Sequence, residues 1–122
     1  MLTSVEIKAH ADFLGFELCG IAPAGNFPEL RFFREWLDRG FAGEMNYLNR
    51  TADQRSDVRR VLPSAKTVIA LGTVYNVDRP YSTEQSDPDH AHVSRYAWGM
   101  DYHTVVEKRT EHLLSWMREK KS

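Results

Sequence analysis

The strongest secondary-structure signal in this chain is the run Lys66-Thr67-Val68-Ile69-Ala70-Leu71-Gly72-Thr73-Val74-Tyr75. Its apolar and β-branched residues favour an extended strand. The run is too continuously apolar to keep one face in water, so we predict that this strand lies at the centre of a sheet. Two shorter segments predict further strands, namely residues 16–22, which are apolar and interrupted by Gly20, and residues 92–97.

A helix is predicted near the amino terminus, before the first strand. Thr3 and Glu6 have the spacing of a capping box, in which each side chain accepts a hydrogen bond from the other residue's backbone N–H. The apolar face of this helix is predicted to consist of Val5, Ala9, Phe13 and Leu14. Gly15 follows as a residue that can end the helix.

Three helical segments are predicted between the strand at residues 16–22 and the strand at residues 66–75. Pro28 suits the first turn of a helix, which needs no N–H donor there, and Gly40 is expected to end that helix. Residues 43–50 predict a short helix. Ser56 is predicted to cap one more helical turn, which runs to Leu62.

The final helix is predicted to begin after Asp101. Its apolar residues fall on one stripe, which consists of Val105, Val106, Leu113, Trp116 and Met117. The pattern continues to Ser122 without a glycine, asparagine or proline stop, so we expect the chain to be a truncated part of a longer protein.

The order of these segments predicts an α+β fold of mixed layers, with a central, mostly apolar sheet flanked by helices. The length fits a single domain over residues 1–122. Residues 76–91 form a polar connection that is long enough to be functional or mobile. Most of the large aromatic side chains are expected in the core, namely Phe32, Phe33, Trp36, Tyr47, Trp98 and Trp116.

The charge balance limits the classes of partner. Sixteen basic residues face seventeen acidic residues, for a net charge of −1. This argues against a chain that grips nucleic acid by charge alone. A local basic patch is still compatible with this charge balance, and its candidate residues are Arg50, Arg55, Arg59 and Arg60. Arg55 and Arg59 would share one helical face, for which a solvated surface is the favoured interpretation from the residues alone.

Cys19 is the single cysteine, which excludes an internal disulfide and an iron–sulfur site built from cysteines of one chain. Its apolar neighbours favour a small core residue over a nucleophile. The first residues have no basic region followed by an apolar run, and no stretch approaches membrane-spanning length. We therefore expect a cytoplasmic protein without a signal peptide and without a membrane partner.

Histidine-rich and catalytic motifs give weaker signals. His90 and His92 lie near Asp87 and Asp89, and alternate residues of a strand share a face, so two imidazoles could hold one ion. No third strong ligand has a matching spacing, so a solvated polar loop is favoured and no metal site is assigned. A phosphate-binding glycine loop and a Gly-x-Ser-x-Gly turn are both missing from the sequence.

The stretch Gly99-Met100-Asp101-Tyr102-His103 joins a predicted strand end to a helix start, where ligand groups tend to bind in α/β folds. Asp101 can be the N-cap of the helix, and this interpretation outweighs a catalytic one because caps are common. His103 is the better functional candidate, because a neutral imidazole can donate or accept a proton at pH 7.

Two motifs resemble a known family. The first motif is Gly43-Glu44-Met45, and the second is Ser94-Arg95-Tyr96-Ala97-Trp98-Gly99-Met100-Asp101-Tyr102-His103. Both are similar to motifs in the amino-terminal domain of the cobalamin-dependent epoxyqueuosine reductases. The likeness covers essentially the whole chain, and the second motif is the specific one. The family reduces epoxyqueuosine to queuosine in tRNA, the last step of queuosine biosynthesis, with cobalamin and two [4Fe–4S] clusters. Its fold is similar to that of cobalamin-processing proteins and reductive dehalogenases.

The resemblance implies roles for individual residues. By position, Arg55 and Ser94 match residues that contact cobalamin. The residues that match the signature around the cofactor and substrate cavity are Arg95, Tyr96, Asp101, Tyr102 and His103. The family's proton donor lies beyond the position of Ser122, so no catalytic residue is assigned within this chain.

The cysteines that hold both clusters also lie beyond this chain. The resemblance therefore implies a domain that supplies part of a cobalamin site and part of a tRNA anticodon-loop site. The iron–sulfur domain would be part of the same protein or a separate subunit. The alternatives are a stand-alone, non-catalytic corrinoid-binding or docking module, and a reductase of the wider cobalamin and iron–sulfur group with another substrate.

Overall fold

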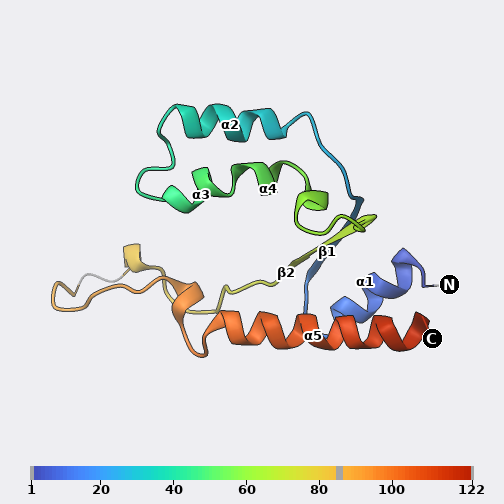
Figure 1. Ribbon diagram of the computed structural model, residues 1–122. Helices are drawn as coiled ribbons and strands as arrows, with labels where there is room; N and C mark the ends of the chain where they lie inside the picture. The colour runs from blue at the N-terminus through green and yellow to red at the C-terminus, as the bar shows by residue number, and fades with distance from the viewer. Residues whose placement is uncertain (1, 85–86, 122) are drawn as a thin grey trace. The chain divides into compact units, whose positions relative to one another are not determined.

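The computed structural model describes residues 2–84 and 87–121 (Figure 1). Its helices and strands, in chain order, are α1 (Ser4–Phe13), β1 (Leu18–Pro23), α2 (Leu30–Asp38), α3 (Asn46–Arg50), α4 (Ala52–Ser56), β2 (Thr67–Gly72) and α5 (Tyr102–Lys121). Single 3₁₀ turns lie at Val58–Arg60, Ser82–Glu84 and Arg95–Ala97. The described residues thus form an α+β fold of five α-helices and one two-stranded sheet. Part of the predicted polar connection (residues 85 and 86) and the predicted end of the last helix at Ser122 lie outside the described residues.

The two strands pair with each other in antiparallel register. The Ala24 backbone N–H, just after β1, donates to the Lys66 carbonyl, just before β2, at 2.9 Å. Farther along the pair, Gly20 faces Ala70, whose Cβ would lie 3.9 Å from a Cβ built on Gly20. Two of the three predicted strands, at residues 16–22 and 66–75, are therefore present, and each begins within one or two residues of its predicted start.

The prediction that the second strand is the centre of a sheet is wrong. Because the sheet in the described residues has two strands, β2 is an edge strand. Along it, Val68 and Ala70 are exposed while Ile69 and Leu71 are partly buried, so only one face of the strand is covered. A continuous apolar run is compatible with a strand that is covered on one side, because periodicity alone does not report how many neighbours a strand has.

The third predicted strand, at residues 92–97, is also absent from the part of the chain that the structure describes. Its second half is the 3₁₀ turn Arg95–Ala97, in which the Ala97 N–H donates to the Ser94 carbonyl at 2.9 Å. The Trp98 indole N–H donates back to the Val93 carbonyl at 2.9 Å. These local bonds satisfy backbone groups that a strand would have paired with a neighbour.

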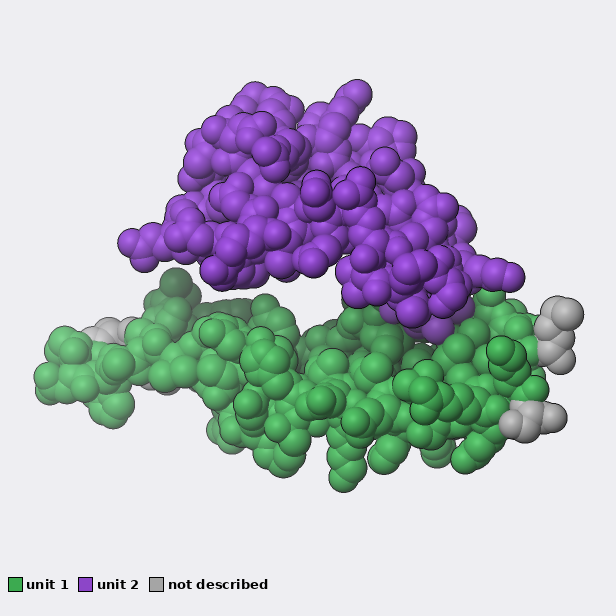
Figure 2. Space-filling view, viewed as in Figure 1, with its two compact units in different colours: residues 1–20, 70–122 green, residues 21–69 purple. Residues whose placement is uncertain are grey.

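The chain divides into two compact units (Figure 2). The first unit contains residues 1–20 and 70–122, and the second contains residues 21–69. The core of the first unit is built on Ala11, Phe16 and Leu113, which are at most 3% exposed. Here α1 lies beside α5, and the two helices run in opposite directions (Figure 1).

In α1 the capping box is confirmed, whereas the predicted apolar face is wrong. The Thr3 N–H donates to Glu6 at 2.9 Å, and the Glu6 N–H donates to the Thr3 hydroxyl at 3.3 Å. The buried residues are Ile7 and Ala11, one turn apart. On the predicted face, Phe13 is 80% exposed. The predicted and buried residues are both apolar, so the sequence did not distinguish the face that meets α5.

The second unit contains α2, α3, α4 and the turn Val58–Arg60. Leu37 in α2 is buried, and Gly40, at φ +73°, follows the helix as predicted. The predicted cap Ser56 is instead the last residue of α4. Asp57 caps the following turn, because its carboxylate accepts from the Arg59 N–H.

The expected burial of the aromatic set is also largely wrong. Phe32, Tyr47 and Trp98 are each more than 40% exposed. Phe33, Trp36 and Trp116 are partly buried. The stripe predicted for α5 is confirmed, since all five of its residues are buried or partly buried. Among the described residues, no helix is long and apolar enough to cross a membrane.

Candidate functional site

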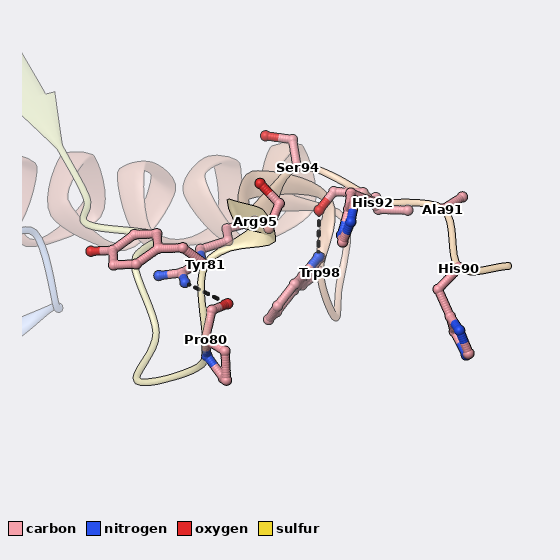
Figure 3. A pocket seen from close by; sticks show the side chains of 10 residues that line it. Pro80, Tyr81, His90, Ala91, His92, Ser94, Arg95 and Trp98 are labelled. Atoms are coloured by element: carbon pink, nitrogen blue, oxygen red, sulfur yellow. Dashed lines mark hydrogen bonds between the residues drawn. The ribbon is translucent and has the colours of Figure 1, made fainter. Parts of the chain in front are cut away.

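The residues of the specific motif, 94–103, belong to the first unit and lead from the polar connection into the start of α5. Figure 3 shows three of them, Ser94, Arg95 and Trp98. Ser94 precedes the 3₁₀ turn and is exposed. Its neighbours line a cavity of about 440 Å³. The lining residues are Pro80, Tyr81, Ser82, His90, Ala91, His92, Val93, Ser94, Arg95 and Trp98.

Arg95 is the most connected side chain of this cavity. One terminal nitrogen donates to the Asn76 side-chain oxygen and to the Val77 carbonyl, the latter at 2.9 Å. The other donates to the carbonyls of Arg79, at 2.6 Å, and Pro80, at 3.2 Å. Figure 3 shows the guanidinium beside Pro80 and Tyr81. The family resemblance predicts that Arg95 lies near the cofactor and substrate cavity, and nothing in the sequence indicated these partners.

Three tyrosines form a second cavity, of about 400 Å³, with Thr73. Tyr96 is the central ring and meets Tyr75 and Tyr102 edge to face, with centroid distances of 6.4 Å and 5.9 Å. Edge-to-face packing of this kind holds aromatic rings in fixed orientations. Tyr96 and Tyr102 were sequence candidates. Tyr75 and Thr73 were missed, because they were read only as the end of a strand.

Asp101 is confirmed as the cap of α5. Its Oδ1 accepts from the His103 backbone N–H and meets the His103 Nδ1, each at 2.9 Å. The first of these bonds, followed by the second, lowers the pKa of the Asp101 carboxyl. Asp101 is therefore ionised at neutral pH and is poorly suited to donate a proton.

His103 is oriented by the same carboxylate. Because an ionised carboxylate only accepts, the Nδ1 of His103 carries the hydrogen and the Nε2 is left to accept when the ring is neutral. The imidazole also stacks on Tyr102, with a centroid distance of 4.0 Å. The motif thus places an oriented imidazole against Tyr102, which lines the tyrosine cavity. The functional role predicted for His103 stays a prediction.

The two histidines of the polar connection do not converge. His90 Nδ1 lies 2.7 Å from Asp87 Oδ2, and Figure 3 shows the His90 ring apart from His92. Across residues 2–84 and 87–121, no group of three potential ligands could hold a metal ion.

Arg55 belongs to the second unit and is described with it. Its Nε donates to the Thr51 hydroxyl at 3.0 Å, and its guanidinium lies 6.0 Å from the centre of the Tyr47 ring. Thr51 in turn donates to the Tyr47 carbonyl at 2.7 Å. This network uses one edge of the guanidinium. Within the described residues, the two terminal nitrogens of Arg55 make no hydrogen bond or ion pair, so they can receive a ligand.

The other arginines of this cluster behave differently. Asp57 binds Arg59 at 2.6 Å, and Arg60 lies 3.7 Å from Asp53. The prediction that Arg55 and Arg59 share a helical face is wrong, because Asp57 between them is extended, at φ −157° and ψ 122°. The side-chain hydrogen bond from Arg59, then its backbone N–H, lowers the pKa of Asp57 to about 2.

Comparisons with known proteins agree on one family. The family profile described as epoxyqueuosine reductase QueG, DUF1730, matches residues 55–122. Similar curated proteins, each named epoxyqueuosine reductase, come from Gloeobacter violaceus, Cellulophaga algicola and Vibrio cholerae. Their identities to this chain are 36%, 38% and 34%, over 94%, 93% and 88% of it.

The matched part is a minor share of those proteins. The alignments cover 35%, 36% and 30% of the three relatives, so the chain spans about a third of the length of the curated relatives it matches. No solved structure matches the chain significantly. The family profile covers more than half of the chain, including the motif at residues 94–103, and the chain therefore belongs to the epoxyqueuosine reductase QueG, DUF1730, family.

Proposed function

We propose that this chain is the amino-terminal domain of an epoxyqueuosine reductase and supplies one part of its cobalamin and substrate site. The observation that carries the proposal is the family match over residues 55–122, which includes Arg55, Ser94 and the rest of the specific motif. The reaction of the whole protein would be the reduction of epoxyqueuosine to queuosine in tRNA. The relatives from Gloeobacter violaceus, Cellulophaga algicola and Vibrio cholerae, which match over most of this chain, are each named epoxyqueuosine reductase.

The residues present fit the edge of a corrinoid rather than a complete site. A cavity of about 440 Å³ suits a drug-sized ligand, whereas a corrin ring with its nucleotide tail is larger. The periphery of a corrin carries amide groups, which hydroxyl and guanidinium donors can bind. The exposed Ser94 hydroxyl and the terminal nitrogens of Arg55 offer such donors.

The proposed roles follow from this chemistry. Ser94 and Arg55 would each bind the cofactor's polar periphery. When bound, cobalamin would supply the reducing centre for opening the epoxide. Asp101 would orient His103, and the tyrosine cavity with His103 would contribute to the wall of the substrate site. Asp101 would not protonate the epoxide oxygen, because its lowered pKa keeps it ionised. The proton donor would come from outside this chain.

The electron supply would also come from outside these 122 residues. Cys19 is the single cysteine, and a [4Fe–4S] cluster is typically held by four cysteines. We therefore propose an iron–sulfur partner, as a further domain of the same protein or as a separate subunit, and the tRNA anticodon loop as the substrate of the complete assembly.

The reaction can be tested in the native organism. The gene would be deleted, and nucleosides from digested tRNA would be measured by liquid chromatography and mass spectrometry. We expect epoxyqueuosine to accumulate and queuosine to disappear, and the native gene to reverse both. Unchanged queuosine, in an organism with no second gene of this family, would refute the reductase assignment. The same measurement separates it from a related reductase with another substrate.

The cofactor role can be tested through Arg55→Ala in the full-length native protein. We expect less cobalamin to be retained after purification, measured from the corrin absorption per mole of protein. Arg50→Ala is the matched control, because Arg50 is an exposed arginine of the neighbouring helix α3. Equal cofactor content in wild type, variant and control would remove Arg55 from the site without touching the family assignment.

A stand-alone corrinoid-binding or docking module is the alternative. Several large apolar side chains of the first unit are exposed, among them Met100 at 71%, which is compatible with a partner surface. Isolation of the native protein distinguishes the two. A single chain with bound clusters favours the reductase domain, whereas an equimolar complex with a cysteine-rich protein favours docking.

A further inference from the structure

The guanidinium of Arg95 is occupied by one short segment of its own chain. Its two terminal nitrogens face four oxygen acceptors, from the Asn76 side chain and the carbonyls of Val77, Arg79 and Pro80. Two terminal nitrogens of a guanidinium carry four hydrogens between them. The donors that an arginine would offer to a phosphate or carboxylate are thus matched by residues 76–80.

The same group also lies over two aromatic rings. The Arg95 Cζ lies 4.6 Å from the centre of the Tyr81 ring and 6.0 Å from that of Trp98. Such stacking favours the charged guanidinium. Within residues 2–84 and 87–121, Arg95 has no ion pair with a carboxylate. Carbonyl dipoles and aromatic faces therefore compensate its charge.

We propose that Arg95 is a positioning residue, which holds residues 76–80 against the 3₁₀ turn and so fixes the cavity wall that faces Ser94. Pro80, Tyr81 and Trp98 line that cavity and contact the guanidinium (Figure 3). We call the four hydrogen bonds from Arg95 to residues 76–80 the Arg95 clamp. Residues 76–80 form no helix or strand, so these bonds hold the segment in place where backbone hydrogen bonding of its own does not. This role goes beyond the proposed function and does not depend on which ligand the cavity takes.

The clamp requires an arginine. A lysine ammonium is a single point charge with three donors, so it cannot reach four separated acceptors while lying over the Tyr81 ring. Arg95→Lys keeps the charge and removes the fork. A residue that served a ligand through its charge would tolerate that change better than a residue that clamps a segment.

The experiment compares millisecond-to-second hydrogen exchange of wild type, Arg95→Lys and Arg95→Ala, read by mass spectrometry. Arg79→Lys is the matched control, because the clamp uses only the Arg79 carbonyl. We expect the rate of hydrogen exchange over residues 76–84 to rise about tenfold or more in both Arg95 variants. Each lost hydrogen bond from the charged guanidinium removes stabilisation of the closed loop, and loss of about 1.4 kcal/mol already corresponds to a tenfold rise. Exchange within α5 should stay at the wild-type rate, and the control should match wild type throughout.

Two further readouts separate positioning from a general loss of fold. The indole N–H signal of Trp98 in a nitrogen-15 spectrum should shift in Arg95→Lys, while those of Trp36 and Trp116 stay in place. In Arg95→Ala, millimolar guanidinium should restore loop protection and the Trp98 signal, and ammonium should not. If Arg95→Ala fails to fold, Arg95→Lys alone carries the test.

Three outcomes would overturn the proposal. The first is an unchanged loop and Trp98 signal in Arg95→Lys. The second is a rise in exchange that spreads equally through α5, which would indicate a structural residue of the whole unit. The third is perturbation of the Arg95 side-chain signals in the wild type by 10 mM inorganic phosphate, at roughly physiological ionic strength, which would indicate a charge open to anions. None of these measurements needs cobalamin or tRNA, so their failure is separate from failure of the proposed function.

Discussion

Replacement of Gly15 by alanine tests the junction that joins α1, β2 and α5 in the first unit. Gly15 has a φ of +88°, and a Cβ built there would lie 3.1 Å from the Arg109 Cζ. The Arg109 guanidinium donates to the Gly15 carbonyl at 2.7 Å and to the Thr73 hydroxyl at 3.3 Å. The added methyl group therefore has two effects: it disfavours the left-handed backbone conformation at residue 15, and it crowds the Arg109 side chain that closes the junction.

The expected cost has two parts. A non-glycine residue in the left-handed region costs about 1–2 kcal/mol. The Arg109 guanidinium must also move by a few tenths of an ångström, which weakens a hydrogen bond from a charged donor that is worth at most about 1.5–3 kcal/mol. We therefore expect Gly15→Ala to lower the free energy of unfolding by about 1–5 kcal/mol, more than the backbone part alone, in a small domain whose total stability is about 5–15 kcal/mol.

The assay is urea unfolding followed by far-ultraviolet circular dichroism. A double-mutant cycle with Arg109→Ala separates the two parts, because Gly15→Ala in that background should cost only the backbone part. Gly40→Ala is a second control, since Gly40 has a φ of +73° and no atom within 4 Å of a built Cβ. If Gly15→Ala costs the same with and without Arg109, the side chain does not close the junction and the reasoning is refuted.

Three further outcomes follow from local contacts. Thr3→Ala should lower the free energy of unfolding by about 1 kcal/mol in a thermal melt, because the N-cap of α1 is lost, and an unchanged melt would contradict the capping box. Asp57 should titrate near pH 2 by carboxyl NMR, since the Arg59 side chain lowers its pKa. The contribution of Asp57 to stability is then fully present above its unfolded pKa of 3.8 and is lost as the pH falls toward 2. Arg59→Ala should raise the pKa of Asp57 toward its unfolded value, and an unchanged titration would contradict the assigned pair. Leu113→Ala should cost about 2–5 kcal/mol in urea unfolding, and Leu114→Ala less than about 1, because the first is 3% exposed and the second 45%; equal costs would contradict the assigned core.

Local signals were readable in the sequence because both partners lie within a few residues. The Thr3 capping box, the Asp101 cap and the stripe of α5 each depend on contacts one turn apart, and each is present. The family was readable for a related reason, since the motif at residues 94–103 is continuous. These features need no knowledge of which segments meet in space.

The misplaced features depend on distant partners. The apolar run of β2 does not reveal that β1 is its one neighbour in the described residues. The acceptors of Arg95 lie 15 to 19 residues before it, in a loop with no periodicity. Likewise, Tyr75 joins the tyrosine cavity only because the chain returns there at Tyr96. A sequence pattern can identify which residues belong to such a site, but the residues that they contact are known only once the fold is known.

The discontinuous first unit has a consequence for synthesis on the ribosome. Residues 21–69 can form their own contacts as soon as they emerge, whereas Ala11 and Phe16 must wait for their core partner Leu113 in α5, about a hundred positions later. Bringing Gly20 to Ala70 closes a loop whose entropy costs about 3 kcal/mol, apart from a constant. The nascent chain should therefore order residues 21–69 first and leave α1 without its partner helix, with Phe16 accessible to chaperones, until α5 has been made.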